Sequence, residues 1–306
     1  MSDIKVDIVE VGLRDGLQND PAMLNTEGKL EFINRLIDAG IRRMEVASFV
    51  NPKRVPQMAD SDEVMRRVPR DKGVKYIGLA LNDKGMERAI AAQCDEVNFV
   101  VVASDTFGQR NQNATAEQSL AVFEQMVGLA READIPCSIT IGASFGCPFE
   151  GEIPVERLVW ISKRAAELGA SEIAIADTIG VADPWEVKRR VGAVREVTGE
   201  VPLRCHFHNT RNTGIANAFA AVEAGVRILD ASCGGIGGCP FAPKATGSIA
   251  TEDLIYMLSR AGVQTGVDIS KLIATSHWLE SALDHKVPGM VSKAGVFPKE
   301  SAAAAE

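Results

Sequence analysis

The chain has 306 residues and a formal net charge of −8 at neutral pH. Hydrophobic residues make up 46% of it and charged residues 24%, which supports a large packed core and excludes a disordered or collagen-like chain. The acidic balance disfavours a nucleic-acid-binding protein, which presents a basic face. No apolar run approaches the ~18 residues that suggest a membrane span. We therefore expect neither a nucleic-acid partner nor a membrane partner.

Short β-branched runs alternate with amphipathic helical patterns along the whole chain. Strands are expected at residues 6–11, 43–48, 75–81, 96–103, 137–143, 172–177, 202–208 and 227–232. Helices are expected between and after them at residues 27–39, 61–67, 84–92, 116–132, 155–168, 184–197, 213–224 and 251–261. Strict alternation of this kind predicts a parallel sheet, and eight such units over roughly 250 residues favour an α/β fold of the closed (β/α)8 TIM barrel type.

We interpret residues 1–306 as a single catalytic domain, with the barrel at about 4–262 and a helical extension at about 268–298. Within that extension, residues 270–284 predict one further helix. Thr26 is expected to cap the first helix, and Gly40 and Gly169 are expected to follow two helix ends. Hydrophobic positions on the terminal helices are compatible with a homodimer.

The cysteines and the N-terminal residues indicate the cellular setting. Six cysteines without a CxxC pair are typical of free thiols in a reducing compartment. Residues 1–7 lead directly into the first expected strand, without the pattern of a signal or transit peptide. We therefore expect a cytoplasmic protein.

Polar side chains of reactive types gather at the expected strand ends. In TIM barrels the catalytic residues lie at the carboxyl ends of the strands. The candidates at these positions are Arg14, Asp15, Glu45, Ser48, Asp177, His206 and His208.

The pair His206 and His208 is the sharpest of these signals. Residues i and i+2 of a strand point to the same face, so both imidazoles are expected to face the barrel mouth while Cys205 and Phe207 pack against the helices. Two histidines on one face are suited to binding a metal ion. The alternative is a pair of core or substrate-binding histidines without a metal.

Asp15 is expected to add a carboxylate to the two histidines. One carboxylate, two neutral imidazoles and water suit Mg²⁺ or Mn²⁺, and zinc stays open. The alternative for Arg14 and Asp15 is an ion pair that stabilises a tight loop between Gly12 and Gly16.

Two cysteines lie in loops after expected strands. Cys239 follows the glycine-rich run at residues 234–238, whose glycines permit movement or a close approach to a ligand. Its thiol is either a proton-transfer group on a lid or an inert loop residue. For Cys147, we expect a structural role.

Several of these segments together resemble the hydroxymethylglutaryl-CoA lyase family, which consists of metal-dependent enzymes on a TIM barrel. The resemblance covers roughly residues 4–268 and rests on residues 11–19, 45–50, 55–58, 177–180 and 237–242 together with His206 and His208. It implies a carbon–carbon lyase that cleaves 3-hydroxy-3-methylglutaryl-CoA to acetyl-CoA and acetoacetate, a reaction of leucine degradation. An acyl-CoA is then the substrate partner.

The resemblance also implies roles for individual residues. Asp15, His206 and His208 would bind Mg²⁺ or Mn²⁺. Arg14 would stabilise the thioester enolate, and Cys239 would take part in proton transfer. The remaining implied positions are Glu45 and Asp177 in the hydroxyl and metal network, and Gln18 and Ser48 in the substrate pocket. His206 and Cys239 both stay open as the general base.

Two departures from the family pattern bear on metal and substrate binding. Ser248 stands where the family usually has an additional asparagine ligand, and a hydroxyl is a poorer ligand than an amide oxygen. Arg211 lies in the segment after His208, which usually reads Asp-Thr-Tyr-Gly-Gln, and it is a candidate substrate contact. These changes leave open a related thioester such as citramalyl-CoA, a Claisen-type synthase, or a barrel that binds acyl-CoA without turnover.

Overall fold

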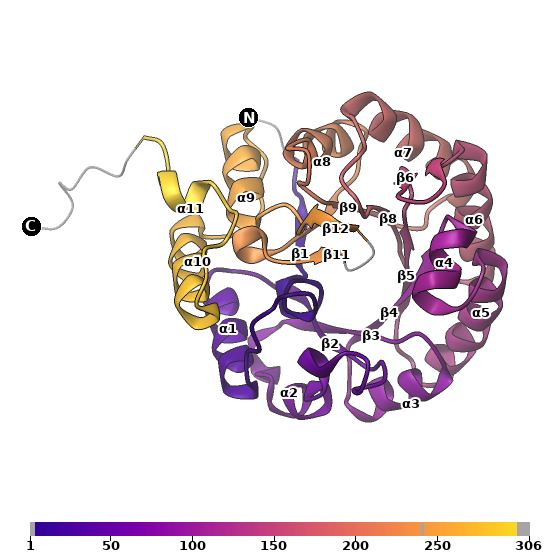
Figure 1. The fold of residues 1–306 in the computed structure, drawn as a ribbon, viewed down its shortest axis with the longest axis horizontal. Coiled ribbons are helices and arrows are strands. Elements are labelled where there is room, and N and C mark those ends of the chain that lie inside the picture. The colour runs from indigo at the N-terminus through magenta and orange to yellow at the C-terminus, as the bar shows by residue number, and fades with distance from the viewer. Residues whose placement is uncertain (1–3, 240–241, 299–306) are drawn as a thin grey trace, which may run out of the picture.

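A closed barrel of parallel strands forms the centre of the computed structural model, which describes residues 4–239 and 242–298 (Figure 1). The strands follow one another around the barrel in the order β1-β2-β3-β4-β5-β8-β9-β10, and β10 closes against β1. This confirms the expected (β/α)8 TIM barrel. The strand bounds are β1 Asp7–Glu10, β2 Arg43–Ser48, β3 Lys75–Leu79, β4 Glu96–Val102, β5 Cys137–Gly142, β8 Ile173–Asp177, β9 Leu203–Phe207 and β10 Ile228–Ala231.

Helices surround the barrel and cover the outward faces of its strands (Figure 1). Those that follow the eight barrel strands are α1 Thr26–Asp38, α2 Ser61–Arg67, α3 Asp83–Ala91, α5 Ala116–Glu132, α6 Val155–Leu168, α7 Pro184–Thr198, α8 Gly214–Glu223 and α9 Thr251–Arg260. The expectation that Thr26 caps α1 was wrong. Asn25 is the cap, because its side chain accepts a hydrogen bond of 2.9 Å from the Gly28 amide.

Several short elements at the strand ends have no counterpart among the expected ones. A π-helical turn, η1 (Gly12–Gly16), follows β1, and α4 (Asp105–Gln112) follows β4. The remaining ones are the 3-10 turns η2 Pro56–Met58, η3 Arg70–Lys72 and η4 Cys233–Gly235, and the strand pairs β6 Gly146–Cys147 with β7 Gly151–Glu152 and β11 Gly238–Cys239 with β12 Ala242–Thr246.

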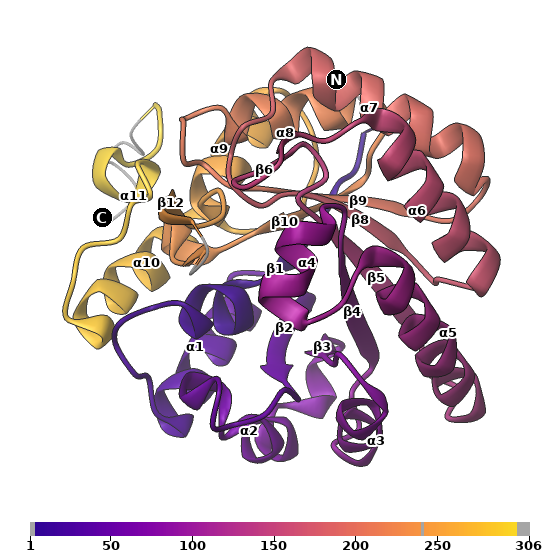
Figure 2. The same cartoon turned by 45° about the vertical axis from the view of Figure 1, so that its right-hand side comes forward.

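The extension after the barrel contains α10 (Ile269–Leu283) and α11 (Val291–Ala294). Figure 1 and Figure 2 show both helices on the outer side of the ring, with α10 beside α1 and α9 and α11 beside α9 and α10. Trp278 of α10 lies 6.0 Å from the ring of Phe32 in α1, and Leu272 and Leu279 are fully buried. Within residues 4–239 and 242–298, no helix has the length and apolar character needed to cross a bilayer.

The barrel interior contains a layer of charged side chains below the carboxyl ends of the strands. Arg43, Glu96, Glu172, Arg204 and Asp230 come from or adjoin five different strands and are linked by ion pairs. Arg204 is 0% exposed. Buried charges are tolerated when they are paired and hydrogen-bonded, and the ion pairs of this layer connect side chains from strands around the barrel.

Gly247, directly after β12, provides a test of how closely this segment packs against the backbone of Gly235 and Ile236. A Cβ at this position would lie 2.6 Å from the carbonyl oxygens of Gly235 and Ile236. We expect Gly247→Ala to lower the free energy of unfolding by about 1–3 kcal/mol through overpacking. Gly192→Ala is the control, because Gly192 is exposed in α7 with nothing within 4 Å of an added methyl group, and it should gain about 0.5–1 kcal/mol. Urea unfolding followed by circular dichroism measures both, and a Gly247→Ala variant as stable as the parent would contradict the packing argument.

Candidate metal centre and active site

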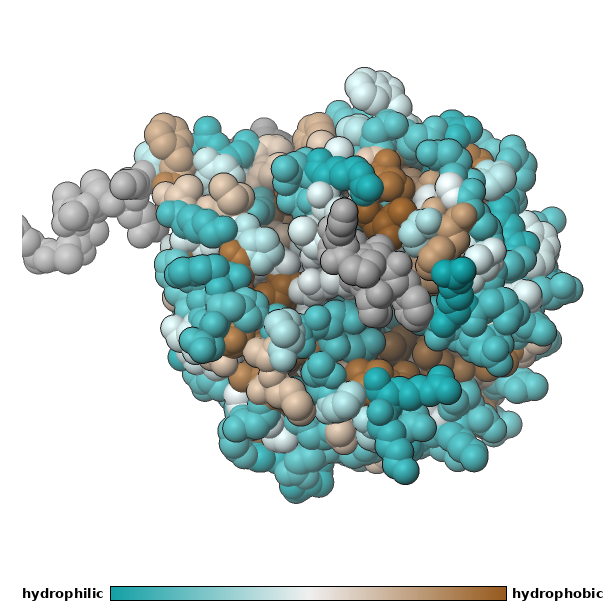
Figure 3. Space-filling view, in the orientation of Figure 1, coloured by the Kyte–Doolittle hydropathy of each residue, from teal (hydrophilic) through white to brown (hydrophobic). Residues whose placement is uncertain are grey.

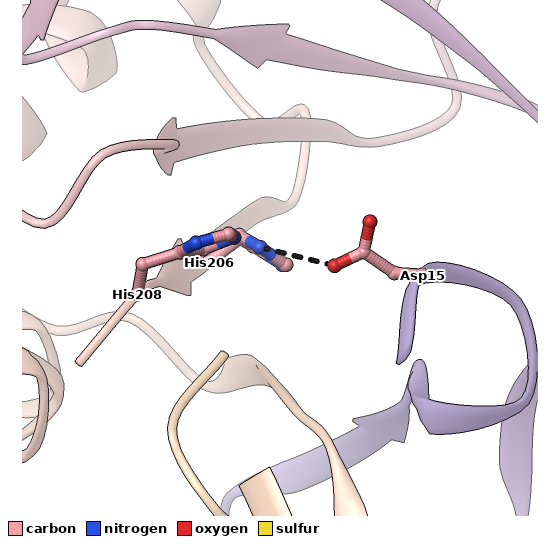
Figure 4. A group of neighbouring side chains, drawn as sticks. All are labelled: Asp15, His206 and His208. Atoms are coloured by element: carbon pink, nitrogen blue, oxygen red, sulfur yellow. Dashed lines mark ion pairs between the residues drawn. The ribbon is translucent and has the colours of Figure 1, made fainter. Parts of the chain in front are cut away.

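Asp15, His206 and His208 converge at the mouth of the barrel (Figure 4). Asp15 lies in η1, His206 in β9, and His208 directly after that strand. One ligand atom from each of the three residues lies within 4.8 Å of the other two. The Nε2 atom of His206 is 3.9 Å from Oδ2 of Asp15. One carboxylate oxygen and two imidazole nitrogens are thus close enough to share one cation.

The opposite nitrogen of each imidazole is held by a neighbour. Nδ1 of His206 is 3.1 Å from Oδ2 of Asp230, and Nδ1 of His208 is 3.0 Å from the carbonyl oxygen of Thr246. A carbonyl oxygen only accepts hydrogen bonds, so we assign the proton of His208 to Nδ1. The carboxylate of Asp230 favours the same assignment for His206. Both Nε2 lone pairs are then directed away from these partners and available to a metal ion.

The surroundings of the site favour an ionised Asp15 and a neutral His208, which are the forms that can bind a cation. Burial opposes ionisation of Asp15, but Arg14 and the two histidines outweigh it and lower the pKa of this carboxyl. Burial, together with the nearby His206, lowers the pKa of His208 to about 4, so this imidazole is neutral at pH 7. For His206, burial favours the neutral form, but the hydrogen bond and charge of Asp230 raise the pKa. A cation therefore competes with a proton for Nε2 of His206.

Ser248 belongs to the same group of atoms. Its hydroxyl oxygen lies 3.4 Å from Oδ2 of Asp15 and 3.4 Å from Nε2 of His206, and the side chain is buried. A bridge between His208 and Ser248 fixes the backbone of both residues. The set of one carboxylate, two imidazoles and one hydroxyl fits a hard or borderline divalent cation such as Mg²⁺ or Mn²⁺.

Arg14 connects the candidate metal ligands to β2. Its Nε donates to Glu45 at 2.7 Å, and its Nη1 donates to Asp15 at 3.0 Å. Burial opposes the charge of the guanidinium, but Glu45 and Asp15 together raise its pKa. The ion pair with Asp15 that the sequence left open as an alternative is therefore present. Arg14 also lines the open cavity, so the same side chain remains a fixed positive charge beside the site.

A cavity of about 860 Å³ opens above these residues. Its lining includes Arg14, Asp15, Gln18, Glu45, His206 and His208, together with apolar residues of β3, of β4 and of the loop after β2, and several asparagines and threonines. Figure 3 shows hydrophobic residues within a hollow on this face of the molecule. A cavity with a few convergent polar groups and apolar walls is typical of a binding site for an organic substrate.

Comparison with known proteins identifies the family. The HMGL-like family matches residues 5–279. The chain belongs to this family. It is 43% identical over 305 residues to an (R)-citramalyl-CoA lyase of Chloroflexus aurantiacus, covering 96% of each protein. It is 37% identical over 284 residues to a hydroxymethylglutaryl-CoA lyase of Bacillus subtilis, covering 93% of this chain and 95% of the relative.

A solved structure supports the same assignment. An HMG-CoA lyase from A. baumannii, determined in complex with coenzyme A and 3-methylmalate, superposes with a TM-score of 0.93 at 40% identity, covering 97% of each chain. The family and the named relatives show that the chain is a carbon–carbon lyase.

Two of the expected site residues of this lyase contact the backbone of the loop after β8 and do not line the cavity. The carboxylate of Asp177, at the end of β8, accepts hydrogen bonds from the amides of Val181 at 3.0 Å and Ala182 at 2.9 Å. The guanidinium of Arg211 donates to the carbonyl oxygens of Ile179 and Gly180. Both side chains therefore fix the loop after β8, and neither is among the residues that line the cavity.

The other expected positions differ in how closely they approach the cavity. Gln18 lines it, whereas the buried hydroxyl of Ser48 has no hydrogen-bond partner among the described residues and does not line it. The backbone of Cys239 belongs to β11 beside Gly238, which lines the cavity, but the Cys239 side chain lies outside the described part of the chain. Cys147 is buried and hydrogen-bonded to Ser104 at 2.9 Å, which fits the structural role expected for it.

Sequence reasoning missed Asp230, the residue that holds His206. A signal was available, because an aspartate stands between Leu229 and Ala231 in an otherwise apolar strand. With a period of two, its two neighbours face the helices and Asp230 faces the barrel interior.

Ser248 yields a prediction about metal affinity. We expect Ser248→Asn to tighten Mn²⁺ binding by about tenfold, because an amide oxygen is a better ligand than a hydroxyl and tenfold corresponds to about 1.4 kcal/mol. Ser248→Ala is the control and should change the Kd for Mn²⁺ by less than about threefold, since the other ligands are intact. Titration followed by electron paramagnetic resonance measures free Mn²⁺ directly. Equal affinities of the asparagine variant and the parent would show that position 248 is not a ligand position.

Proposed function

We propose that the chain cleaves 3-hydroxy-3-methylglutaryl-CoA to acetyl-CoA and acetoacetate, using Mg²⁺ or Mn²⁺. The observation that supports this most is the convergence of Asp15, His206 and His208 beside the fixed guanidinium of Arg14, at a cavity large enough for an acyl thioester. The resemblance and the named relatives supply the class of substrate.

The cleavage imposes three chemical requirements on the site. The C3 hydroxyl must lose its proton, the C2–C3 bond must break, and C2 must then gain a proton. The electron pair of the broken bond passes to the thioester as an enolate, while C3 becomes the ketone carbon of acetoacetate. No water is consumed, because the proton taken from the hydroxyl is balanced by the proton added to C2.

The described residues fit these requirements. A bound divalent cation lowers the pKa of a coordinated hydroxyl. Asp15, His206 and His208 would hold this cation, with the Ser248 hydroxyl beside them. Arg14 would face the enolate oxygen, where a fixed positive charge stabilises the charge that develops in the transition state. Glu45 holds Arg14 in place through its 2.7 Å contact.

Proton transfer and substrate contacts complete the proposal. Of the two expected candidates for the base, we propose Cys239, because a metal ion on Nε2 and a proton on Nδ1 leave His206 no nitrogen that can accept a proton. Cys239 is also the candidate donor to C2. Gln18 contacts the substrate from the cavity wall. We propose that Asp177 and Arg211 affect the reaction indirectly, because their side chains hydrogen-bond to the backbone of the loop after β8 and hold it in place. Ser48 and Arg211 stay predictions as direct substrate contacts.

A second candidate substrate is citramalyl-CoA. The observation in its favour is the 43% identity to the Chloroflexus aurantiacus (R)-citramalyl-CoA lyase. The two thioesters share the C3 hydroxyl, the C3 methyl group and the acetyl-CoA portion, and they differ by one methylene before the terminal carboxylate. Citramalyl-CoA therefore undergoes the same bond cleavage and yields acetyl-CoA and pyruvate.

The cellular compartment and the oligomeric state of the protein are also matters of proposal. The described cysteines Cys94, Cys137, Cys147, Cys205 and Cys233 are free and buried. Free thiols support a reducing compartment, and we propose the cytoplasm. A homodimer stays a prediction.

Parallel assays with the two thioesters test the proposed function. We expect acetyl-CoA together with acetoacetate from 3-hydroxy-3-methylglutaryl-CoA, measured by liquid chromatography and mass spectrometry. Pyruvate formed at a higher kcat/KM from citramalyl-CoA would assign the second substrate instead. Chelation should abolish turnover of either substrate, and added Mg²⁺ or Mn²⁺ should restore it. Turnover that persists in chelator would contradict the metal-dependent mechanism.

The proposed role of Arg14 is tested separately. We expect Arg14→Met to lower kcat by about 10²–10³-fold, the usual loss when a fixed donor to a developing oxyanion is removed. KM should change less, because the enolate charge is absent from the bound substrate. Arg66→Met is the control, because Arg66 is an exposed residue paired with Glu63 on α2. An Arg14→Met variant with unchanged kcat and a normal fold would remove the enolate role.

A further inference from the structure

Asp230 is a buried carboxylate that no part of the proposed reaction uses directly. It is 3% exposed and lies in β10, the strand next to β9. Its Oδ2 is 3.1 Å from Nδ1 of His206, on the side of the imidazole opposite to the metal-binding nitrogen. We propose that Asp230 is the positioning residue of His206, and that Arg204 holds Asp230 in the orientation this requires. The inference rests on the proposed metal centre.

Arg204 fixes the carboxylate of Asp230 from the other side. Its Nη1 donates to Oδ1 of Asp230 at 3.0 Å, while its Nε lies 2.7 Å from Oε1 of Glu172. The two oxygens of Asp230 thus have different partners, Arg204 and His206. A rotation of the carboxylate would break both contacts, so the imidazole ring of His206 is held in one orientation.

Glu172 is in turn held by a second guanidinium. Arg43 of β2 contacts both oxygens of Glu172, at 2.7 and 3.0 Å, and also pairs with Glu96 of β4. The positioning of His206 therefore extends through the charged layer to strands on other sides of the barrel. Rigid strands hold a ligand more accurately than a loop does.

The two histidines differ in what supports them. His208 has the neutral carbonyl of Thr246 behind it, whereas His206 has a carboxylate. A carboxylate partner increases the electron density at the opposite nitrogen and strengthens its bond to a metal ion. We therefore infer that His206 is the stronger of the two nitrogen ligands and that it depends on Asp230.

The formal charges agree with this assignment. With every carboxylate ionised, the charged layer of Arg43, Glu96, Glu172, Arg204 and Asp230 carries −1. Asp15 adds another −1, and the pair of Arg14 and Glu45 adds none. One divalent cation neutralises this total. Because unpaired buried charge is costly, the charge of Asp230 and the charge of the cation stabilise each other.

The test is Mn²⁺ binding to the full-length protein, measured by electron paramagnetic resonance. Asp230→Asn should raise the Kd for Mn²⁺ by about 10–100-fold, as expected when a carboxylate behind a histidine ligand is lost. Asp60→Asn is the control: it also removes the carboxylate of an ion pair, here with Lys29, but Asp60 lies outside the charged layer and does not contact His206. Its Kd should stay within about threefold of the parent.

A double variant covers the case in which Asp230→Asn leaves Arg204 unpaired and fails to fold. Arg204→Met with Asp230→Asn removes one positive and one negative charge together, and it should fold and still bind Mn²⁺ weakly. In the folded variants, raising the Mn²⁺ concentration should recover most of the lost kcat while KM for the thioester stays unchanged, a rescue that a merely structural role would not show.

The results distinguish a failure of the proposed role of Asp230 from a failure of the metal centre. A Kd within threefold of the parent in either folded variant, or a loss of turnover that excess Mn²⁺ does not restore, would overturn the role of Asp230. A parent protein that does not bind Mn²⁺ at all would overturn the metal centre itself, and with it the proposed function.

Discussion

The site depends on one constraint, the two-residue period of β9. Arg204, His206 and His208 share a face because alternate residues of a strand point the same way. In a closed barrel that face is the interior. Cys205 and Phe207 occupy the other face and pack in the core under the helices. One strand thus supplies a buried anchor, Arg204, and two candidate metal ligands, arranged from the barrel interior to its mouth.

Closure of the barrel brings the other residues of the site, Asp230 and Asp15, next to His206. The strand order places β10 beside β9 and β1 beside β10, so Asp230 and Asp15 approach His206 from neighbouring positions although they are far apart in sequence. A doubly wound open sheet has no such closure between its first and last strands. The charged layer occupies space that apolar side chains fill in many TIM barrels. Buried ion pairs of this kind contribute little to the free energy of unfolding. We therefore attribute the layer to the orientation of His206, which it holds fixed.

Much of this arrangement could be predicted from the sequence because it depends on periodicity. The eight strands and the helices after them follow from alternating patterns, and His206 and His208 follow from their spacing. The π-helical turn η1 and helix α4 could not be predicted, because both are short and their conformation depends on tertiary contacts. The cap of α1 was assigned one residue late, since Asn25 and Thr26 are both good capping residues.

Side-chain partners were harder to predict than elements. Asp230 was missed although it is an isolated charge in β10, and its two partners depend on which strands become neighbours. Asp177 and Arg211 show the same difficulty, because the resemblance implied a hydroxyl and metal network for Asp177 and the sequence suggested a substrate contact for Arg211, whereas the contacts that both make in the structure are to backbone groups of the loop after β8. A charged residue at a strand end thus indicates the correct end of the barrel without indicating what its side chain contacts.

The choice between the two candidate substrates is a question about the cavity wall and not about the metal ligands. Both thioesters present the same hydroxyl to the cation and the same developing enolate to Arg14, so a change in either group should affect both reactions alike. One methylene is worth about 1–3 kcal/mol in a fitted pocket. Discrimination of that size requires residues that face the terminal carboxylate, and Asn111, Thr140 and Thr178 line the cavity with polar side chains. Substitutions there should change the ratio of the two rates, whereas substitutions at Asp15 or His206 should lower both.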